Sequence, residues 1–219
     1  MLLSAWRNHA SDSSGADAVG ALKQELLRLG SMVEESAVLA RAVLSVPDME
    51  AAPLIRRGDD RIDKLYRRLE GECADLLCQK RLNQAQVREV LSYMHCLRDL
   101  ERFGDYCKEL ATLGEQLLPA QPVIMGDDIL TRLDRCRSLL ALALDSLSEA
   151  DLSAGPRLQA LDDLVDRDYE RLVEQLTETC TTGNTCRDHQ LELVLVLRCI
   201  ERMADHAVNV SQRVARREP

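Results

Sequence analysis

The chain repeats itself at a spacing of about one hundred residues, and this duplication limits its possible folds more than any other feature. The segment 59–69, DDRIDKLYRRL, matches 162–172, DDLVDRDYERL, at an offset of 103. The segment 97–106, LRDLERFGDY, matches 197–206, LRCIERMADH, at an offset of 100. The chain is therefore predicted to contain two copies of one unit. The three-residue difference should lie between the second and third elements of each copy.

Apolar residues recur at helical spacing throughout the chain, and no long run alternates with the period of a strand. Aromatic residues make up only 3% of the chain, so Leu, Ala and Val must do most of the packing, as in helical bundles. We predict an all-α protein of two antiparallel three-helix bundles related by the duplication. The predicted parts are a mobile tail (1–18), a first bundle (19–118), a linker (119–126) and a second bundle (127–217). Helices are expected over about 19–46, 49–79, 83–118, 127–150, 156–179 and 188–216.

Composition excludes several classes of protein. The net charge of −9 disfavours nucleic acid as a partner, because binding it requires neutralising phosphates. No apolar run has the length of a signal peptide or a transmembrane helix. The eight cysteines form no C-x-x-C pair, and most fit helical patterns as small apolar residues. We expect a soluble, reduced, cytoplasmic protein. The chain has no phosphate loop or nucleophile elbow, so we do not expect an enzyme.

Acidic pairs spaced four residues apart occur once in the second and once in the third helix of each half. Such a spacing places both carboxylates on one helix face. The pairs are Asp59 with Asp63, Glu101 with Asp105, Asp162 with Asp166, and Glu201 with Asp205. If the faces meet, four carboxylates converge in each half and need a neutralising partner. Arginines could serve, namely Arg98, Arg102, Arg198 and Arg202. A hard cation suits an all-oxygen cluster equally well, and the pairs could also lie on solvated faces. His206 is not expected to be a ligand.

Other matched positions are expected to be structural. Tyr66 and Tyr169 should pack with a polar tip. Gly104 and Ala204 are both small and indicate a close approach between helices.

The segments LRDLERFGDYCKEL and LRCIERMADHAVNV resemble the signature of PhoU proteins, which carry a Leu-Glu-Arg-Ile-(Gly/Ala)-Asp motif once per half. The likeness covers about residues 19–215. It implies two three-helix bundles with pseudo-two-fold symmetry, and a negative regulator of phosphate uptake and phosphate-starvation signalling. The implied partners are a phosphate ABC transporter ATPase and a membrane sensor histidine kinase, met at the cytoplasmic membrane face. Contact with the membrane would be peripheral, through these partners, and a homodimer is expected.

The resemblance also implies a metal site in each half, holding iron, manganese, zinc or magnesium. Carried over by position, the ligands are Asp59, Asp63, Glu101 and Asp105 in the first half, and Asp162, Asp166, Glu201 and Asp205 in the second. The first half departs from the family pattern at Leu82 and Gln86, where a Pro and an Asp are usual. The alternatives are an accessory of a low-affinity phosphate transporter, a metal-free helical scaffold, and, as the weakest, a carboxylate-metal enzyme.

Overall fold

The structure, a computed structural model, describes residues 2–45, 50–78, 82–117, 127–151, 153–178 and 184–215. These residues form six helices and no strand. The helices are α1 (Leu2–Ser45), α2 (Ala51–Cys78), α3 (Gln84–Leu117), α4 (Asp127–Glu149), α5 (Ala154–Glu178) and α6 (Asn184–Ala215). The predicted all-α fold is confirmed.

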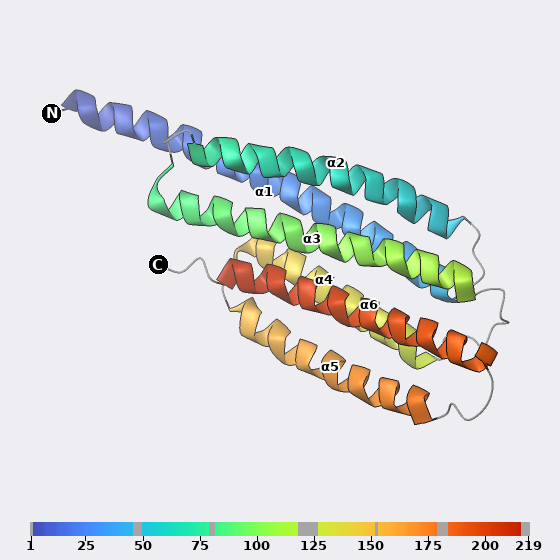
Figure 1. Ribbon diagram of the computed structural model, residues 1–219. Coiled ribbons are helices and arrows are strands. Elements are labelled where there is room, and N and C mark those ends of the chain that lie inside the picture. The colour runs from blue at the N-terminus through green and yellow to red at the C-terminus, as the bar shows by residue number, and fades with distance from the viewer. Residues whose placement is uncertain are drawn as a thin grey trace.

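The six helices form two three-helix bundles that share one long seam (Figure 1). Consecutive helices run antiparallel, with α2 on the outside of the first bundle and α5 on the outside of the second. Across the seam, α1 packs against α4 and α3 packs against α6. Each helix at the seam therefore meets its own counterpart from the other copy, as a two-fold relation between the copies requires.

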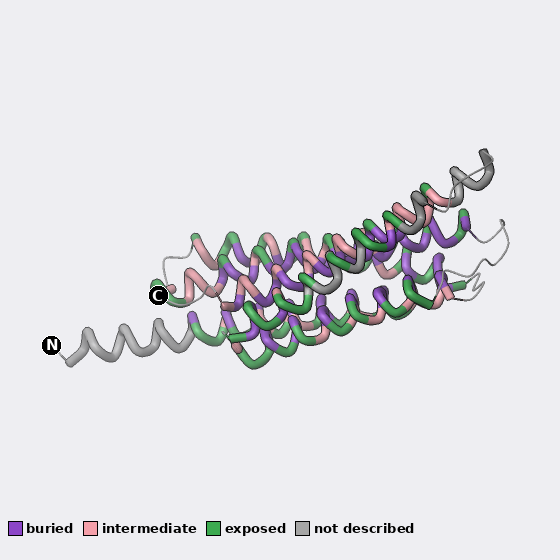
Figure 2. Tube along the Cα trace, turned by 90° about the horizontal axis from the view of Figure 1, so that it is seen from below, coloured by how far each residue is buried: buried purple, intermediate pink, exposed green. Residues whose placement is uncertain are grey.

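The core lies on the helix faces that the apolar spacing predicts (Figure 2). Along α1 the apolar residues that recur at helical spacing are buried: Leu22, Leu26, Leu29, Val33, Ala37, Ala40 and Val43. Buried residues of α3 and α6 continue this core through the seam, so the two halves are held together by one apolar interior. Burying a large aliphatic side chain stabilises a fold by about 1.5–3 kcal/mol, which makes this shared interior the main source of stability.

The helix ends show where the prediction differs from the structure. Helix α1 begins at Leu2, so the predicted start near Val19 is too late; the mobility of 1–18 stays a prediction, and the side chains of 1–14 lie outside the described residues. The linker 119–126 also lies outside them. Helix α2 has 28 residues and α5 has 25, so the three-residue difference between the copies is an additional part-turn at the end of α2.

The start of α3, where the chain departs from the PhoU pattern, is capped by the side chains of Asn83 and Gln86. The Asn83 side-chain oxygen accepts a hydrogen bond from the Gln86 backbone N–H at 2.9 Å. The Gln86 side-chain oxygen accepts one from the Asn83 N–H, also at 2.9 Å. This reciprocal capping box satisfies two amides that the first turn leaves free. The helix start is therefore kept without the Pro and the Asp.

The end of α4 uses a left-handed residue. Ala150 has a φ of 55°, and the next residue, Asp151, donates its N–H to the Ser146 carbonyl at 2.9 Å. This is the geometry of a Schellman helix end, in which glycine is the usual residue at the left-handed position. Alanine here carries a steric cost that glycine would not.

Polar contacts and a small residue fix α1 against α4. Arg41 Nε donates to both carboxylate oxygens of Asp134, at 2.8 and 2.9 Å. Lys23 donates to the Ser148 carbonyl at 2.8 Å. Gly30 lies directly under Leu144, and a Cβ at Gly30 would overlap that side chain. Among the described residues, no helix has both the length and the apolar character needed to span a bilayer.

Candidate functional site

The first-half acidic residues lie where α2 and α3 face each other. Asp59 comes from α2 and is only 5% exposed, whereas Asp63, one turn later, is half-buried. Glu101 and Asp105 come from α3 and are half-buried as well. Helical spacing places each pair on one face of its helix, and the packing of α2 against α3 puts the two faces along one seam.

Each of these four carboxylates has a basic neighbour within the first half. Lys108 of α3 donates to Asp59 Oδ2 across the seam. Two arginines bond within their own helices. Arg67 donates to Asp63 at 3.1 Å, and Arg102 donates to Asp105 at 3.2 Å while its Nε lies 3.7 Å from Glu101. Of the two arginines predicted as neutralising partners in this half, Arg102 is confirmed as an ion-pair partner.

Burial and mutual repulsion make these carboxyls harder to ionise. Desolvation raises the pKa of Asp59 above its ordinary value, Lys108 opposes that rise, and Asp63 and Asp105 add to it. Desolvation also raises the pKa of Glu101, followed by the charge of Asp105. The hydrogen bond to Asp59 raises the pKa of the Lys108 ammonium, which Asp105 and Asp63 also hold in its charged form. These carboxylates therefore act on one another electrostatically, and Lys108 is a counter-charge for Asp59, Asp63 and Asp105.

The four first-half carboxylates are paired with basic side chains of the same half. Within the part of the chain that the structure describes, no three His, Cys, Asp or Glu side chains are gathered closely enough to hold one ion. Hard cations require several oxygen ligands around one point. The ligand role of the eight predicted carboxylates stays a prediction.

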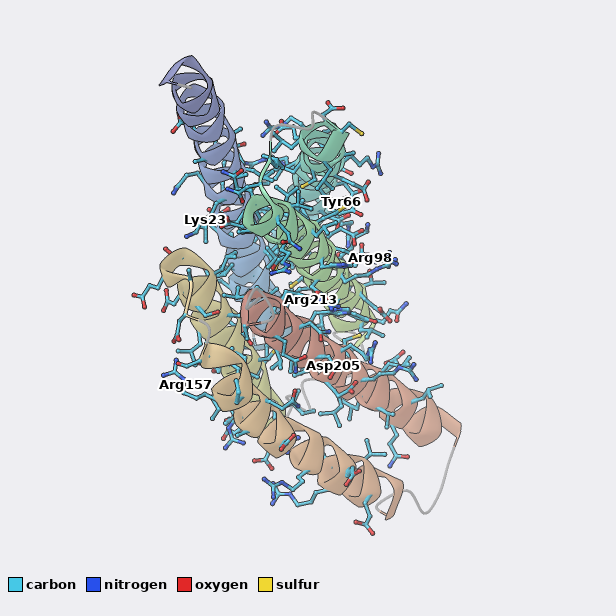
Figure 3. All side chains as sticks on the ribbon, turned by 90° about the vertical axis from the view of Figure 1, so that its left-hand side faces the viewer. Lys23, Tyr66, Arg98, Arg157, Asp205 and Arg213 are labelled. Atoms are coloured by element: carbon cyan, nitrogen blue, oxygen red, sulfur yellow. The ribbon has the colours of Figure 1, made fainter. Side chains whose placement is uncertain are left out.

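The second-half residues are described only on α6. Glu201 and Asp205 are half-buried there; Asp205 is labelled on α6 in Figure 3. Arg202 donates to Asp205 at 2.7 Å, so this predicted arginine partner is confirmed. Asp162 and Asp166 lie on α5, but their side chains are outside the described residues.

A buried polar group at the α3–α6 seam was not identified from the sequence. Asp99 of α3 is 8% exposed, and one of its oxygens lies 3.1 Å from His206 Nδ1. Its other oxygen lies 3.8 Å from Arg213 Nε, and the Arg213 carbonyl accepts a hydrogen bond from Ser92 at 2.9 Å. Arg213 is labelled where α6 meets the first bundle in Figure 3. This polar set joins the two halves beside the buried apolar residues of the seam.

A signal for Asp99 was present in the helical spacing. Asp99 falls on the same stripe as Cys96 and Phe103, which are fully buried. A charged residue inside an apolar stripe is buried and therefore needs a partner. The partner could not be named, because it depends on how α3 is aligned with α6.

Two residues at matched repeat positions touch across the same seam. The rings of Tyr106 and His206 are stacked, with centroids 5.9 Å apart and planes 26° from parallel. A hydrogen bond between Arg202 and Tyr106 raises the pKa of the Arg202 guanidinium. Residues Arg102, Asp105, Tyr106, Lys108, Glu109 and Thr112 line an open hollow of about 390 Å³ beside this stack.

The cysteines behave as apolar residues, as predicted. Six are described, none of them as a disulfide, and five of them are buried; the exception is Cys78. Burial raises the pKa of Cys73 to about 11 and that of Cys199 to about 12. The raised thiol pKa values leave little thiolate for chemistry at neutral pH.

The tyrosine and glycine expectations are confirmed where they are described. Tyr66 is half-buried and donates its hydroxyl to Glu70 at 2.8 Å; its repeat mate Tyr169 has no described side chain. A Cβ at Gly104 would meet Ile62 at 3.5 Å and Val33 at 4.0 Å, so α3 approaches both neighbouring helices closely at this point.

Comparison with known proteins gives the relationship of the chain. The sequence model of the PhoU domain matches residues 26–113 and 130–214, one match in each three-helix bundle. A protein of Synechocystis sp. named phosphate-specific transport system accessory protein PhoU homolog is 33% identical over 208 residues, covering 95% of this chain and 92% of the relative. A homolog of the same name from Pseudomonas putida is 26% identical, covering 94% and 81%.

Solved structures agree with the fold. The crystal structure of PhoU from Pseudomonas aeruginosa matches with a TM-score of 0.86 at 24% identity, covering 91% of this chain and 96% of the other. The phosphate transport system regulatory protein PhoU from Streptococcus pneumoniae matches with a TM-score of 0.83 at 25% identity, covering 93% and 96%. Sequence, duplication and architecture coincide over nearly the whole chain, and the chain is a member of the PhoU family.

Proposed function

We propose that this protein is a negative regulator of phosphate uptake and of phosphate-starvation signalling. The observation that carries the proposal is the match along 95% of the chain to a relative named as an accessory protein of the phosphate-specific transport system. It acts by binding, and catalyses no reaction. Its partners are the ATPase of a phosphate ABC transporter and a membrane sensor histidine kinase, which it meets at the cytoplasmic face of the membrane.

The physical character of the molecule supports a binding role. The helices form a bundle, and the acidic pairs of the first half are paired with basic side chains instead of being arranged around a nucleophile or general base. The net charge of −9 favours association with basic surfaces of partner proteins through electrostatic steering.

We propose further that the protein works as a homodimer, and that a cation is held at the acidic pairs. The donors would be carboxylate oxygens, which suit manganese, iron, zinc or magnesium. Such an ion would hold the second and third helices of a half together by neutralising the charges that face each other. The metal-free scaffold remains the competing proposal, because the first half pairs its carboxylates with Lys108, Arg67 and Arg102.

Deletion of the gene in its native host tests the regulatory proposal. In phosphate-rich medium we expect deletion to raise both phosphate uptake and the expression of a phosphate-starvation reporter, and we expect the wild-type gene to restore repression. Unchanged uptake and reporter signal in the deletion strain would contradict the proposal. The same deletion in a strain lacking the ABC transporter separates the two transporter partners: uptake that still rises there assigns the protein to a low-affinity transporter.

Direct binding is tested by capture of the purified transporter ATPase and of the cytoplasmic part of the kinase on the immobilised protein. The expected result is saturable binding of at least one of them that weakens as salt is raised. Failure of both to bind would contradict the proposed mode of action.

A further inference from the structure

The ion pair between Lys108 and Asp59 occupies the position in the first half that a bound cation would need. Asp59 is the most buried of the four first-half carboxylates, with 6% of its side chain accessible, and its partner reaches it from the opposite helix. A metal at this seam would have to take Asp59 from Lys108 and then lie next to the displaced ammonium. Two positive charges that lie side by side repel strongly, and this repulsion disfavours binding of a cation at this seam.

The other first-half carboxylates are also paired with cationic side chains. Arg67 bonds Asp63, and Arg102 lies against both Glu101 and Asp105. Three basic side chains therefore face four carboxylates, all on α2 and α3. The seam is close to neutral without any ion.

The internal repeat supplies a natural comparison for these three basic residues. Arg102 corresponds to Arg202 at the offset of 100, so this arginine is present in both halves. Lys108 corresponds to Val208 at the same offset, and Arg67 corresponds to Glu170 at the offset of 103. The second half repeats all four acidic positions but has an apolar residue and an additional acid where the first half has two cations.

We propose that Lys108 and Arg67 are built-in counter-ions that replace a divalent cation in the first half. Any such ion that the protein holds at its acidic pairs is then held by the second half. The two copies of the repeat thus differ in charge at these positions: the first half has Lys108 and Arg67 where the second has Val208 and Glu170. This inference deepens the metal part of the proposed function, and its tests do not depend on phosphate regulation.

The first test compares matched neutral variants of the full-length, chelator-treated protein. The number of Mn²⁺ ions bound per chain is measured by equilibrium dialysis and by the loss of the free-ion EPR signal. The first-half variant is Glu101→Gln with Asp105→Asn, and the second-half variant is Glu201→Gln with Asp205→Asn. We expect the first-half variant to bind as much Mn²⁺ as the wild type, and the second-half variant to lose what the wild type binds. Loss of Mn²⁺ from the first-half variant would overturn the proposal.

The second test creates the missing site, and it decides the question even if the wild type binds no Mn²⁺. Giving the first half the residues of the second, with Arg67→Glu and Lys108→Val, should add about one Mn²⁺ per chain. Adding Glu101→Gln to that variant should remove the gain. If circular dichroism shows that it does not fold, Arg67→Gln with Lys108→Met is used, because these side chains keep most of the original volume. A folded variant without additional Mn²⁺ overturns the proposal and leaves the regulatory role intact.

Discussion

The contact between Gly30 and Leu144 allows a sharp test of how the two halves are held together. A methyl group added at Gly30 would lie 3.0 Å from Cδ1 and 3.3 Å from Cγ of Leu144, and closer still to Cδ2. The whole isobutyl group would have to move inside the α1–α4 seam. A methyl group added at Gly104 would meet Ile62 at 3.5 Å, an ordinary packing distance. The variants Gly30→Ala and Gly104→Ala therefore make the same chemical change, one in a crowded site and one in a site with room.

The magnitudes follow from competing terms. Replacing Gly by Ala inside a helix favours the folded state by about 1 kcal/mol. Overpacking costs about 1–3 kcal/mol, so Gly30→Ala should range from neutral to about 2 kcal/mol less stable. Gly104→Ala should be about 1 kcal/mol more stable, and its repeat mate is already Ala204. The two variants should differ by about 1–3 kcal/mol, or about 2–12 °C in melting temperature for a chain of this size.

The assay is thermal and urea unfolding followed by circular dichroism, with the wild type and all variants at one concentration. A matched control is Gly20→Ala, since a Cβ at Gly20 meets nothing within 4 Å and only the helix propensity changes. The reasoning is refuted if Gly30→Ala is stabilised as much as Gly104→Ala, because the close approach of α1 to α4 would then carry no energetic weight.

Four further predictions follow from single contacts. The Lys108 ammonium has a pKa raised above 10.5 in the folded state, so its stabilising effect is complete below that pH; the stability gap between wild type and Lys108→Met should close as pH rises through the folded-state value, as urea unfolding at several pH values would measure. Asp99→Ala should cost about 1–3 kcal/mol, since His206 loses its buried hydrogen-bond partner and Arg213 its nearby carboxylate, while Ala at exposed Asp60 should change unfolding free energy by under about 0.5 kcal/mol. Ala150→Gly should raise the free energy of unfolding by about 0.5–1 kcal/mol, because the φ of 55° at this position suits glycine better than alanine; a higher melting temperature would show it. Mass-spectrometric mapping of alkylation at pH 8 should find Cys78 modified first among the six described cysteines, and comparable rates at the five buried thiols would contradict their burial.

Most of the fold was predictable because each helix is marked by a pattern in its own local sequence. Apolar spacing, Pro47 and the break before Asp127 bound five of the six helices to within a few residues. The start of α1 was missed because residues 1–18, which include the polar segment from Ser11 to Gly15, were predicted to be a mobile tail. Ser, Asp and Gly each cost a helix only about 0.5–1 kcal/mol, and a long helix can continue through them where proline would stop it.

The site was predictable only within single helices. Spacing along α3 placed Glu101 and Asp105 on one face and pointed to Arg102 as a partner. Lys108 was missed because its partner Asp59 is on another helix, and the alignment of α2 against α3 is set by packing over the whole seam. The set formed by Asp99 and His206 depends in the same way on α3 meeting α6. Local periodicity carries no information about such alignments.

The pairing of each seam helix with its own counterpart has a consequence for how this architecture could arise. A single three-helix unit that met a second copy of itself through these helices would form an isologous dimer, in which both faces must be identical. Covalent fusion removes that constraint, because each face is then encoded separately. In a symmetric dimer the equivalent residues would repeat the contact between Gly30 and Leu144. Here they cannot, because at the offset of 103 Gly30 corresponds to Leu133 and Leu144 corresponds to Arg41. The fused chain can thus develop two different halves while keeping the geometry of a symmetric pair.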